Sequence, residues 1–409
     1  MTTETSAETA VIGRRIAENA AFSIIIALSF SHLLNDMMQS LVPSLYPMIK
    51  NTYSLSFVQI GVITLTMQVT SSMVQPLVGL AADHKPQPYS LAIGMCATLG
   101  GLILLAGATH YVMVLLAVAL MGTGSAVFHP EASRVARIAS GGAQRHGLAQ
   151  SLFQVGGNIG SATGPILAAL IVVPKGQGTV GWFSTAALLA MAVLVLVGNW
   201  YRREHPPSRR VLHSAAAPNL SRRHVIWSLV ILLSLVFSKA FYQASLSTYY
   251  TFYLMSKFHL SMANAQIYLF IFLASVAVGT LAGGPIGDRI GRKAVIWGSI
   301  LGAVPFALML PFANLFWTPI LTVAIGATMA SASSAIIVYA IDLVPGKIGT
   351  MAGLFFGLSF GMAGVGAAAL GSLADWTSID TVYRVCAFLP LMGLLTVFLP
   401  DLHRAVRRA

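Results

Sequence analysis

Long apolar stretches occupy most of the chain, and they limit its possible folds more than any other feature. A helix needs about 20 mainly apolar residues to cross a bilayer, where its backbone must satisfy its own hydrogen bonds. Only 9% of the 409 residues are charged, too few to cover a soluble protein of this size. The sequence therefore predicts an all-α integral membrane protein with twelve transmembrane helices, at 21–45, 57–82, 89–108, 111–137, 147–173, 180–200, 225–255, 265–287, 293–312, 317–341, 348–374 and 381–400.

A hydrophilic gap at 201–224 separates the first six predicted helices from the last six. It contains six arginines and three prolines, which is typical of a flexible cytoplasmic linker. We therefore predict two six-helix bundles, at 21–200 and 225–400, with a cytoplasmic N-terminal segment at 1–20 and a cytoplasmic tail at 401–409.

The positions of the basic residues predict the orientation. Of the 24 Lys and Arg residues, Lys239 lies within a predicted span and four lie in loops of one side, which leaves nineteen on the other side. The positive-inside rule places those nineteen, and both termini, in the cytoplasm. This asymmetry accounts for much of the net charge of +12. Outside the predicted spans the sequence has no basic stripe interleaved with aromatic residues, which is the pattern that would indicate nucleic-acid binding. The four residues of the opposite side are Lys50, Lys175, Lys257 and Arg384.

A basic, glycine-containing string, Gly-Pro-Ile-Gly-Asp-Arg-Ile-Gly-Arg-Lys, lies at 284–293 between two predicted spans. Glycine allows helices to approach closely, and a carboxylate can accept hydrogen bonds from the free N–H groups at a helix start. The residues concerned are Gly284, Asp288, Arg289, Gly291, Arg292 and Lys293, and a weaker copy with Gly79 and Asp83 lies about 205 residues earlier. Such internal repeats are common in transporters.

This string resembles the signature loop of the major facilitator superfamily. The resemblance implies two pseudo-symmetric six-helix bundles around a central cavity, with transport by alternating access. It also implies that Asp288 reaches the cytoplasmic end of the fifth helix, near Gly147, and stabilises the outward-facing state. The alternative is a loop that only anchors the topology.

The fifth predicted helix carries Gly160, Gly164 and Pro165 in a Gly-x-x-x-Gly-Pro pattern. The pattern resembles the antiporter motif of superfamily exporters, although small residues in this spacing also serve plain helix packing. Gln154 and Asn158 lie one turn apart on the same helix. They therefore line a cavity or bind a neighbouring helix.

Ionisable residues inside the predicted spans are candidates for function, because each costs about 2.5–3.5 kcal/mol at mid-bilayer. His32 and Asp36 lie one turn apart on the first helix and can share a proton. On the fourth helix, Glu131 can pair with Arg134, and His129 precedes them beside a proline. We predict proton coupling by Asp36, Glu131, His32 and His129, with static, structural pairs as the alternative.

Lys239 is the lysine predicted deepest in the membrane, with Tyr242 and Gln243 one turn further on. A cation there suits an anionic substrate group or an ion pair with Asp36. Near the far end of the same helix, three tyrosines are expected to form an interfacial aromatic belt: Tyr249, Tyr250 and Tyr253.

Three longer strings carry a closer resemblance, at 31–40 (SHLLNDMMQS), 122–142 (GTGSAVFHPEASRVARIASGG) and 145–161 (RHGLAQSLFQVGGNIGS). They resemble a group of bacterial inner-membrane exporters within this superfamily that give resistance to the anionic phosphonate antibiotic fosmidomycin. The resemblance implies proton-coupled export of such anions, by a monomer with no metal or cofactor.

Three other functions are kept as alternatives. A proton-coupled importer of small organic anions would use the same charges. A membrane enzyme would use His129 with Glu131, or His32 with Asp36, as acid–base pairs, but no nucleophile motif or clustered metal ligands accompany them. A sensor that does not transport would be expected to carry a soluble domain, and the sequence predicts none.

Overall fold

The computed structural model describes residues 2–84, 87–140, 146–203, 221–344 and 348–401, and every regular element in these ranges is helical. Most of the predicted linker and the tail lie outside the described residues. The side chains of Asp83 and Asp288 and the surroundings of Gly147 and Gly284 are also outside, so the predicted roles of these residues stay predictions.

Helices cover all six spans predicted for the first half. A π-helical turn at Ala168–Val172 continues the fifth span, and a 3₁₀ turn at Gln177–Phe183 begins the sixth. The α-helices of this half are α1 (Thr2–Ser44), α2 (Tyr46–Thr52), α3 (Phe57–His84), α4 (Ser90–Ala106), α5 (Tyr111–Ala139), α6 (His146–Leu167), α7 (Val173–Lys175) and α8 (Ser184–Arg203).

The second half repeats the pattern, with 3₁₀ turns at Leu310–Phe312 and Leu389–Phe398. Its α-helices are α9 (Arg222–Phe258), α10 (Met262–Ile290), α11 (Arg292–Gly302), α12 (Val304–Met309), α13 (Trp317–Leu343), α14 (Ile348–Trp376) and α15 (Ile379–Cys386). Ten helical stretches are long and apolar enough to cross a membrane. With the shorter apolar α4 and the apolar part of α1, they agree with the twelve predicted spans.

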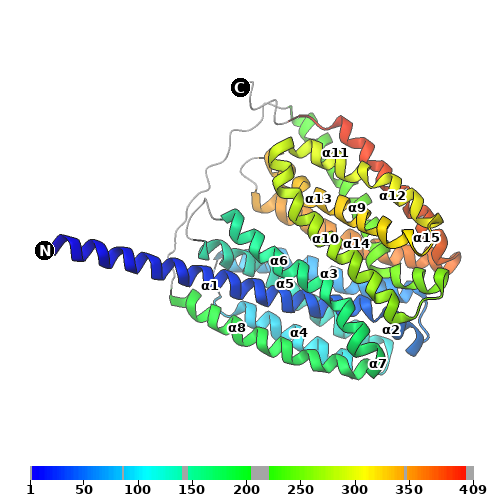
Figure 1. The fold of residues 1–409 in the computed structure, drawn as a ribbon, viewed down its shortest axis with the longest axis horizontal. Coiled ribbons are helices and arrows are strands. Elements are labelled where there is room, and N and C mark those ends of the chain that lie inside the picture. The colour runs from blue at the N-terminus through cyan, green and yellow to red at the C-terminus, as the bar shows by residue number, and fades with distance from the viewer. Residues whose placement is uncertain (1, 85–86, 141–145, 204–220, 345–347, 402–409) are drawn as a thin grey trace.

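α1 starts well before its predicted span, at Thr2 instead of residue 21. Residues 2–20 are rich in Ala, Glu and Arg, which are good helix formers, and contain no proline. The helix therefore continues past the apolar stretch, and Figure 1 shows it projecting from the bundle.

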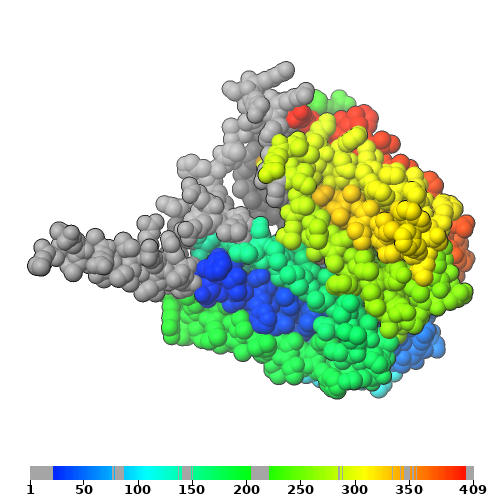
Figure 2. Space-filling model, viewed as in Figure 1, coloured from blue at the N-terminus to red at the C-terminus, as the bar shows by residue number. Residues whose placement is uncertain are grey.

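Two groups of helices lie side by side (Figure 1). In the first half, α1 packs on α6 and α4 on α5, while in the second half α10 and α11 both pack on α13. The halves meet where α3 packs on α14 and α6 on α10. Figure 2 shows the two surfaces, blue to green and yellow to red, meeting along a boundary.

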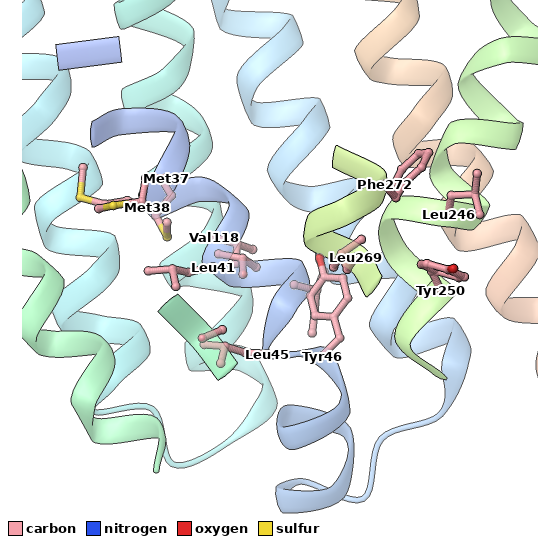
Figure 3. Packing of buried hydrophobic residues seen from close by; sticks show 14 of the residues in the cluster. Met37, Met38, Leu41, Leu45, Tyr46, Val118, Leu246, Tyr250, Leu269 and Phe272 are labelled. Carbon is pink, nitrogen blue, oxygen red and sulfur yellow. The ribbon is translucent and has the colours of Figure 1, made fainter. Parts of the chain in front are cut away.

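The main apolar core continues from one half into the other. Figure 3 follows it from Leu41 of α1, through Tyr46 of α2 and Leu269 of α10, to Leu246 and Phe272 of the second half. Large apolar side chains outside the core, such as Leu170 and Leu196, are exposed on helix surfaces. Such surfaces suit contact with lipid.

Three tyrosines of α9 correct the prediction of an aromatic belt. Tyr249, Tyr250 and Tyr253 are fully buried rather than on the lipid face. Their hydroxyls reach the carbonyl of Ala367 at 2.6 Å, the hydroxyl of Thr322 at 3.2 Å and the carbonyl of Leu310 at 3.3 Å, respectively. Aromatic residues near the end of a span suit either an interface belt or helix packing, and here internal partners for the hydroxyls favour packing.

The molecule has two distinct ends. We call the end where α1 stops and α3 starts the α2 end, and the opposite end, where α8 stops and α9 starts, the linker end.

Candidate transport site

Two histidines flank Asp36 where α1 and α5 meet. Asp36 lies between His32 Nε2, 3.3 Å from Oδ2, and His129 Nε2, 3.5 Å from Oδ1. His32 comes from the previous turn of α1, as the i,i+4 spacing predicts. His129 comes from α5, just before Pro130. We call these three residues the His–Asp–His cluster.

Backbone carbonyls orient both imidazole rings. His32 Nδ1 lies 2.8 Å from the carbonyl of Phe153, and His129 Nδ1 lies 3.0 Å from that of Ser125. A carbonyl oxygen only accepts, so in each ring Nδ1 carries the hydrogen and donates it. Each Nε2 is thereby left facing Asp36.

The surroundings hold the cluster in place. Asn35 donates to Asp36 Oδ1 at 3.0 Å, and the Ser161 hydroxyl lies 3.5 Å from Oδ2. The His32 ring is only 3% exposed and stacks on Phe153 with a centroid distance of 4.1 Å. Gly157 of α6 packs directly against the cluster, because a Cβ there would press on the His32 ring and lie 2.9 Å from Asp36 Oδ2.

The cluster can hold a cation. A neutral imidazole with its hydrogen on Nδ1 would present a lone pair to the carboxylate, which is unfavourable without a positive charge between the groups. One or more protons can supply that charge. One ligand atom from each of the three residues lies within 4.8 Å of the others, and transition metals use these residue types, although the sequence predicts no metal.

Glu131, also predicted to couple protons, lies in a different environment. It is 2% exposed, and Oε1 pairs with Arg134 at 3.6 Å, as the i,i+3 spacing predicts. Its Oε2 lies 3.5 Å from the hydroxyl of Ser90 on α4. Glu131 therefore contacts α4, whereas Asp36 contacts α5 and α6.

Lys239 of α9 donates a hydrogen bond to Ser333 of α13. Among the described residues, Asp36 pairs with His32 and His129, so the structure does not bring Asp36 and Lys239 together as an ion pair. The sequence reasoning missed Ser333. The signal was present, because residues 331–334 hold three serines and one alanine within an apolar span, and such hydroxyls need hydrogen-bond partners there.

The other predicted substrate residues lie in both halves. Tyr242 and Gln243 line a small pocket between α9, α10 and α13, whose other walls include Phe272, Ile325 and Met329. Gln154 and Asn158 are half-buried on α6. The amide nitrogen of Asn158 is buried and has no hydrogen-bond partner in the part of the chain that the structure describes.

The described part of the signature loop is tied to its own half. Arg292 pairs with Asp342 at the end of α13, and Lys293 donates to the carbonyls of Val397, at 3.2 Å, and Leu399. Arg289 is exposed.

Gly291 makes the turn between α10 and α11 with a φ of 90°, which glycine adopts easily. The sequence reasoning did not single out Asp342, whose only signal is its position just after a predicted span.

The Gly-x-x-x-Gly-Pro pattern lies against α1. A Cβ at Gly160 would collide with the backbone of Leu33, and one at Gly164 would collide with Ser40. Pro165 lies inside α6, shortly before the π-helical turn at 168–172. The glycines therefore allow α1 and α6 to approach closely, which both the antiporter motif and plain helix packing require.

Comparisons with known proteins agree with this architecture. The model of the Major Facilitator Superfamily matches residues 28–279 and 240–408. The chain is 60% identical over 381 residues to the fosmidomycin resistance protein of Escherichia coli (strain K12), covering 93% of each chain. It is 41% identical over 383 residues to YfnC, an uncharacterised MFS-type transporter of Bacillus subtilis (strain 168), again covering 93% of each.

Two solved structures share the fold. A bacterial homologue of the human lysosomal transporter Spinster, in an inward-facing and occupied conformation, is 15% identical with a TM-score of 0.71, over 94% of this chain and 95% of that one. A mutant of the nucleoside transporter NupG is 14% identical with a TM-score of 0.71, over 93% of this chain and 99% of that one.

Proposed function

Because this chain belongs to the Major Facilitator Superfamily, we propose that it exports fosmidomycin-like anionic phosphonates, or related small molecules, in exchange for protons. The 60% identity to a fosmidomycin resistance protein supports export and the substrate class. The single observation that carries the proton coupling is the His–Asp–His cluster, in which two imidazole nitrogens face one carboxylate.

The cluster is the site of the coupling proton in this proposal. Carbonyls hold both Nδ1–H groups, so an arriving proton can only bind Nε2 or the carboxylate. A proton held there is shared by groups 3.3 and 3.5 Å apart on α1 and α5. Losing the proton leaves lone pairs facing each other, which changes the relative energies of the conformations of the carrier.

Glu131 is the alternative coupling acid. Its pairing with Arg134 of the same helix and its contact with Ser90 favour a structural role, because the buried carboxylate already has a basic partner that balances its charge. The two carboxylates can be tested side by side.

Lys239 is the proposed site for the anionic group of the substrate. Its ammonium has a neutral hydroxyl, Ser333, as its described partner, so a phosphonate can displace that contact without breaking an ion pair. Tyr242 and Gln243 lie one turn away and supply further polar contacts. Gln154 and Asn158 would meet the substrate from the first half.

We further propose that the protein is a monomer in the bacterial inner membrane, with the linker end and both termini in the cytoplasm. The distribution of Lys and Arg supports this orientation. The α2 end then faces the outside, and substrate enters from the linker end.

Proton movement in vesicles containing the purified protein tests the proposal. With the wild type, adding fosmidomycin to one side of the membrane should release protons on that same side. An imposed pH gradient should drive labelled drug in the direction opposite to that of the protons. Asp36→Asn should abolish both effects. Asp380→Asn, which changes a carboxylate of α15 away from the cluster, should leave them intact.

Three results would contradict parts of the proposal. Drug and protons moving in the same direction would identify an importer. Loss of coupling in Glu131→Gln but not in Asp36→Asn would transfer the coupling role to Glu131. An unchanged affinity for the drug in Lys239→Ala would remove Lys239 from the substrate site.

A further inference from the structure

The described polar contacts between the two halves lie towards the α2 end. Gln266 of α10 donates to the carbonyl of Ser44 of α1 at 2.6 Å, and the Thr64 and Thr248 hydroxyls, from α3 and α9, lie 3.5 Å apart. Tyr249 Oη lies 3.2 Å from the carbonyl of Phe57. The halves are therefore in hydrogen-bonding contact at this end.

Backbones of α3 and α14 approach closely here. A Cβ at Gly61 of α3 would collide with the backbone of Ala367 of α14. In the other direction, a Cβ at Gly371 of α14 would collide with the carbonyl of Phe57. Small residues allow such close contact between membrane helices, and the last turns of α14 thereby lie beside the first turn of α3.

The start of α3 needs partners for its free N–H groups. Ser56 and Gln59 form a capping box: the Gln59 N–H donates to the Ser56 hydroxyl at 3.2 Å, and the Ser56 N–H donates to Gln59 Oε1 at 2.9 Å. These two bonds leave the N–H groups of Phe57 and Val58.

Asp375, at the end of α14, satisfies both remaining groups. Phe57 N–H donates to Oδ1 and Val58 N–H to Oδ2, each at 2.8 Å. A carboxylate at a helix N-terminus also interacts favourably with the helix dipole. One residue of the second half therefore completes the cap of a helix of the first half, 318 residues away in sequence.

We propose that Asp375 is a gating residue of the transport cycle, whose carboxylate holds the α2 end closed by capping α3. Opening this end separates α3 from α14, so the two bonds must break and the N–H groups of Phe57 and Val58 must bind water instead. The cap therefore favours the conformation closed at the α2 end over the one open there. This inference assumes alternating access, but it is independent of what is transported.

A cysteine pair measures the closed state directly. Thr64→Cys with Thr248→Cys places two thiols across the halves, in a background of Cys96→Ser and Cys386→Ala that removes the native thiols. An oxidant should link the pair rapidly when the α2 end is closed, because disulfides need close Cβ atoms. The rate of cross-linking in membranes, without substrate, then reports the population of that state.

Asp375→Ala in this background should lower the cross-linking rate by about fivefold, a moderate effect because the carboxylate is exposed and screened. Asp375→Asn retains one acceptor oxygen and should give an intermediate rate, and its similar shape guards against misfolding. Asp380→Ala removes another carboxylate, from the first turn of α15, and should have no effect.

Equal cross-linking rates in the parent, Asp375→Ala and Asp375→Asn would overturn the proposal, provided that all three proteins elute as folded protein in size-exclusion chromatography. A fall that Asp380→Ala reproduces would also overturn it, because the effect would then come from general surface charge. Neither result depends on drug or proton transport, so failure here and failure of the proposed function can be distinguished.

Discussion

Gly157→Ala is a sharp test of the His–Asp–His cluster, because it disturbs the geometry without removing a titratable group. The added methyl would press on the His32 ring and lie 2.9 Å from Asp36 Oδ2, where contacts of 3.4 Å or more are ordinary. The ring cannot easily retreat, since it is buried, stacked on Phe153 and bonded to a carbonyl. The collision must therefore be relieved by separating His32 from Asp36.

The expected magnitude follows from Coulomb's law. At an effective dielectric constant of about 20, unit charges attract by about 5 kcal/mol at the present 3.3 Å and by about 4 kcal/mol if pushed to about 4.3 Å. The difference of about 1 kcal/mol weakens retention of a shared proton by about fivefold. Drug-driven proton release should therefore fall by about this factor at a fixed pH and recover at lower pH, where protons are more abundant.

The assay is proton release in vesicles across a range of pH values. Gly156→Ala is a matched control, because its methyl would collide with Ser29 on the same pair of helices but away from the cluster. It should lower stability by about 1–3 kcal/mol through overpacking and leave the pH profile unchanged. A Gly157→Ala protein with a wild-type pH profile and rate, or a shifted profile in Gly156→Ala, would refute the reasoning.

Three further predictions concern residues outside the cluster. Glu131→Gln should lower thermal stability, because it removes the negative charge from the buried end of the pair with Arg134, while drug-driven proton release persists; loss of release in folded protein would contradict this. Arg292→Gln should lower the melting temperature by removing the pair with Asp342, and an unchanged melting temperature would show that this pair contributes nothing. Gly61→Val should force α3 from α14 and slow cross-linking between cysteines at the α2 end, whereas an unchanged rate would argue against close packing there.

Local spacing predicted part of the candidate site. His32 and Asp36 share a helix face because they are four residues apart, and Glu131 and Arg134 pair because they are three apart. The spans were equally readable, since crossing a bilayer dictates both length and apolarity.

Contacts between helices that are far apart in the chain could not be predicted from the sequence. That His129 would join Asp36 depends on how α5 crosses α1, and that Lys239 would meet Ser333 depends on how α9 crosses α13. Asp375 was overlooked for the same reason, because its partners are backbone groups and leave no trace in side-chain composition. The tyrosines of α9 were misplaced because the same residues suit a lipid interface and a protein interior.

The contacts at the α2 end have a consequence for tolerance to mutation. On the first half most of the described contacts use main-chain atoms, namely the N–H groups of Phe57 and Val58 and the carbonyls of Ser44 and Phe57, and Thr64 is the one residue that contributes a side chain. On the second half they use the side chains of Asp375, Gln266, Tyr249 and Thr248. Most substitutions at those three first-half positions preserve the main-chain atoms. Substitutions that change the stability of the closed α2 end should therefore accumulate in the second half. The first half continues to offer the same main-chain partners whatever side chains it carries at these positions.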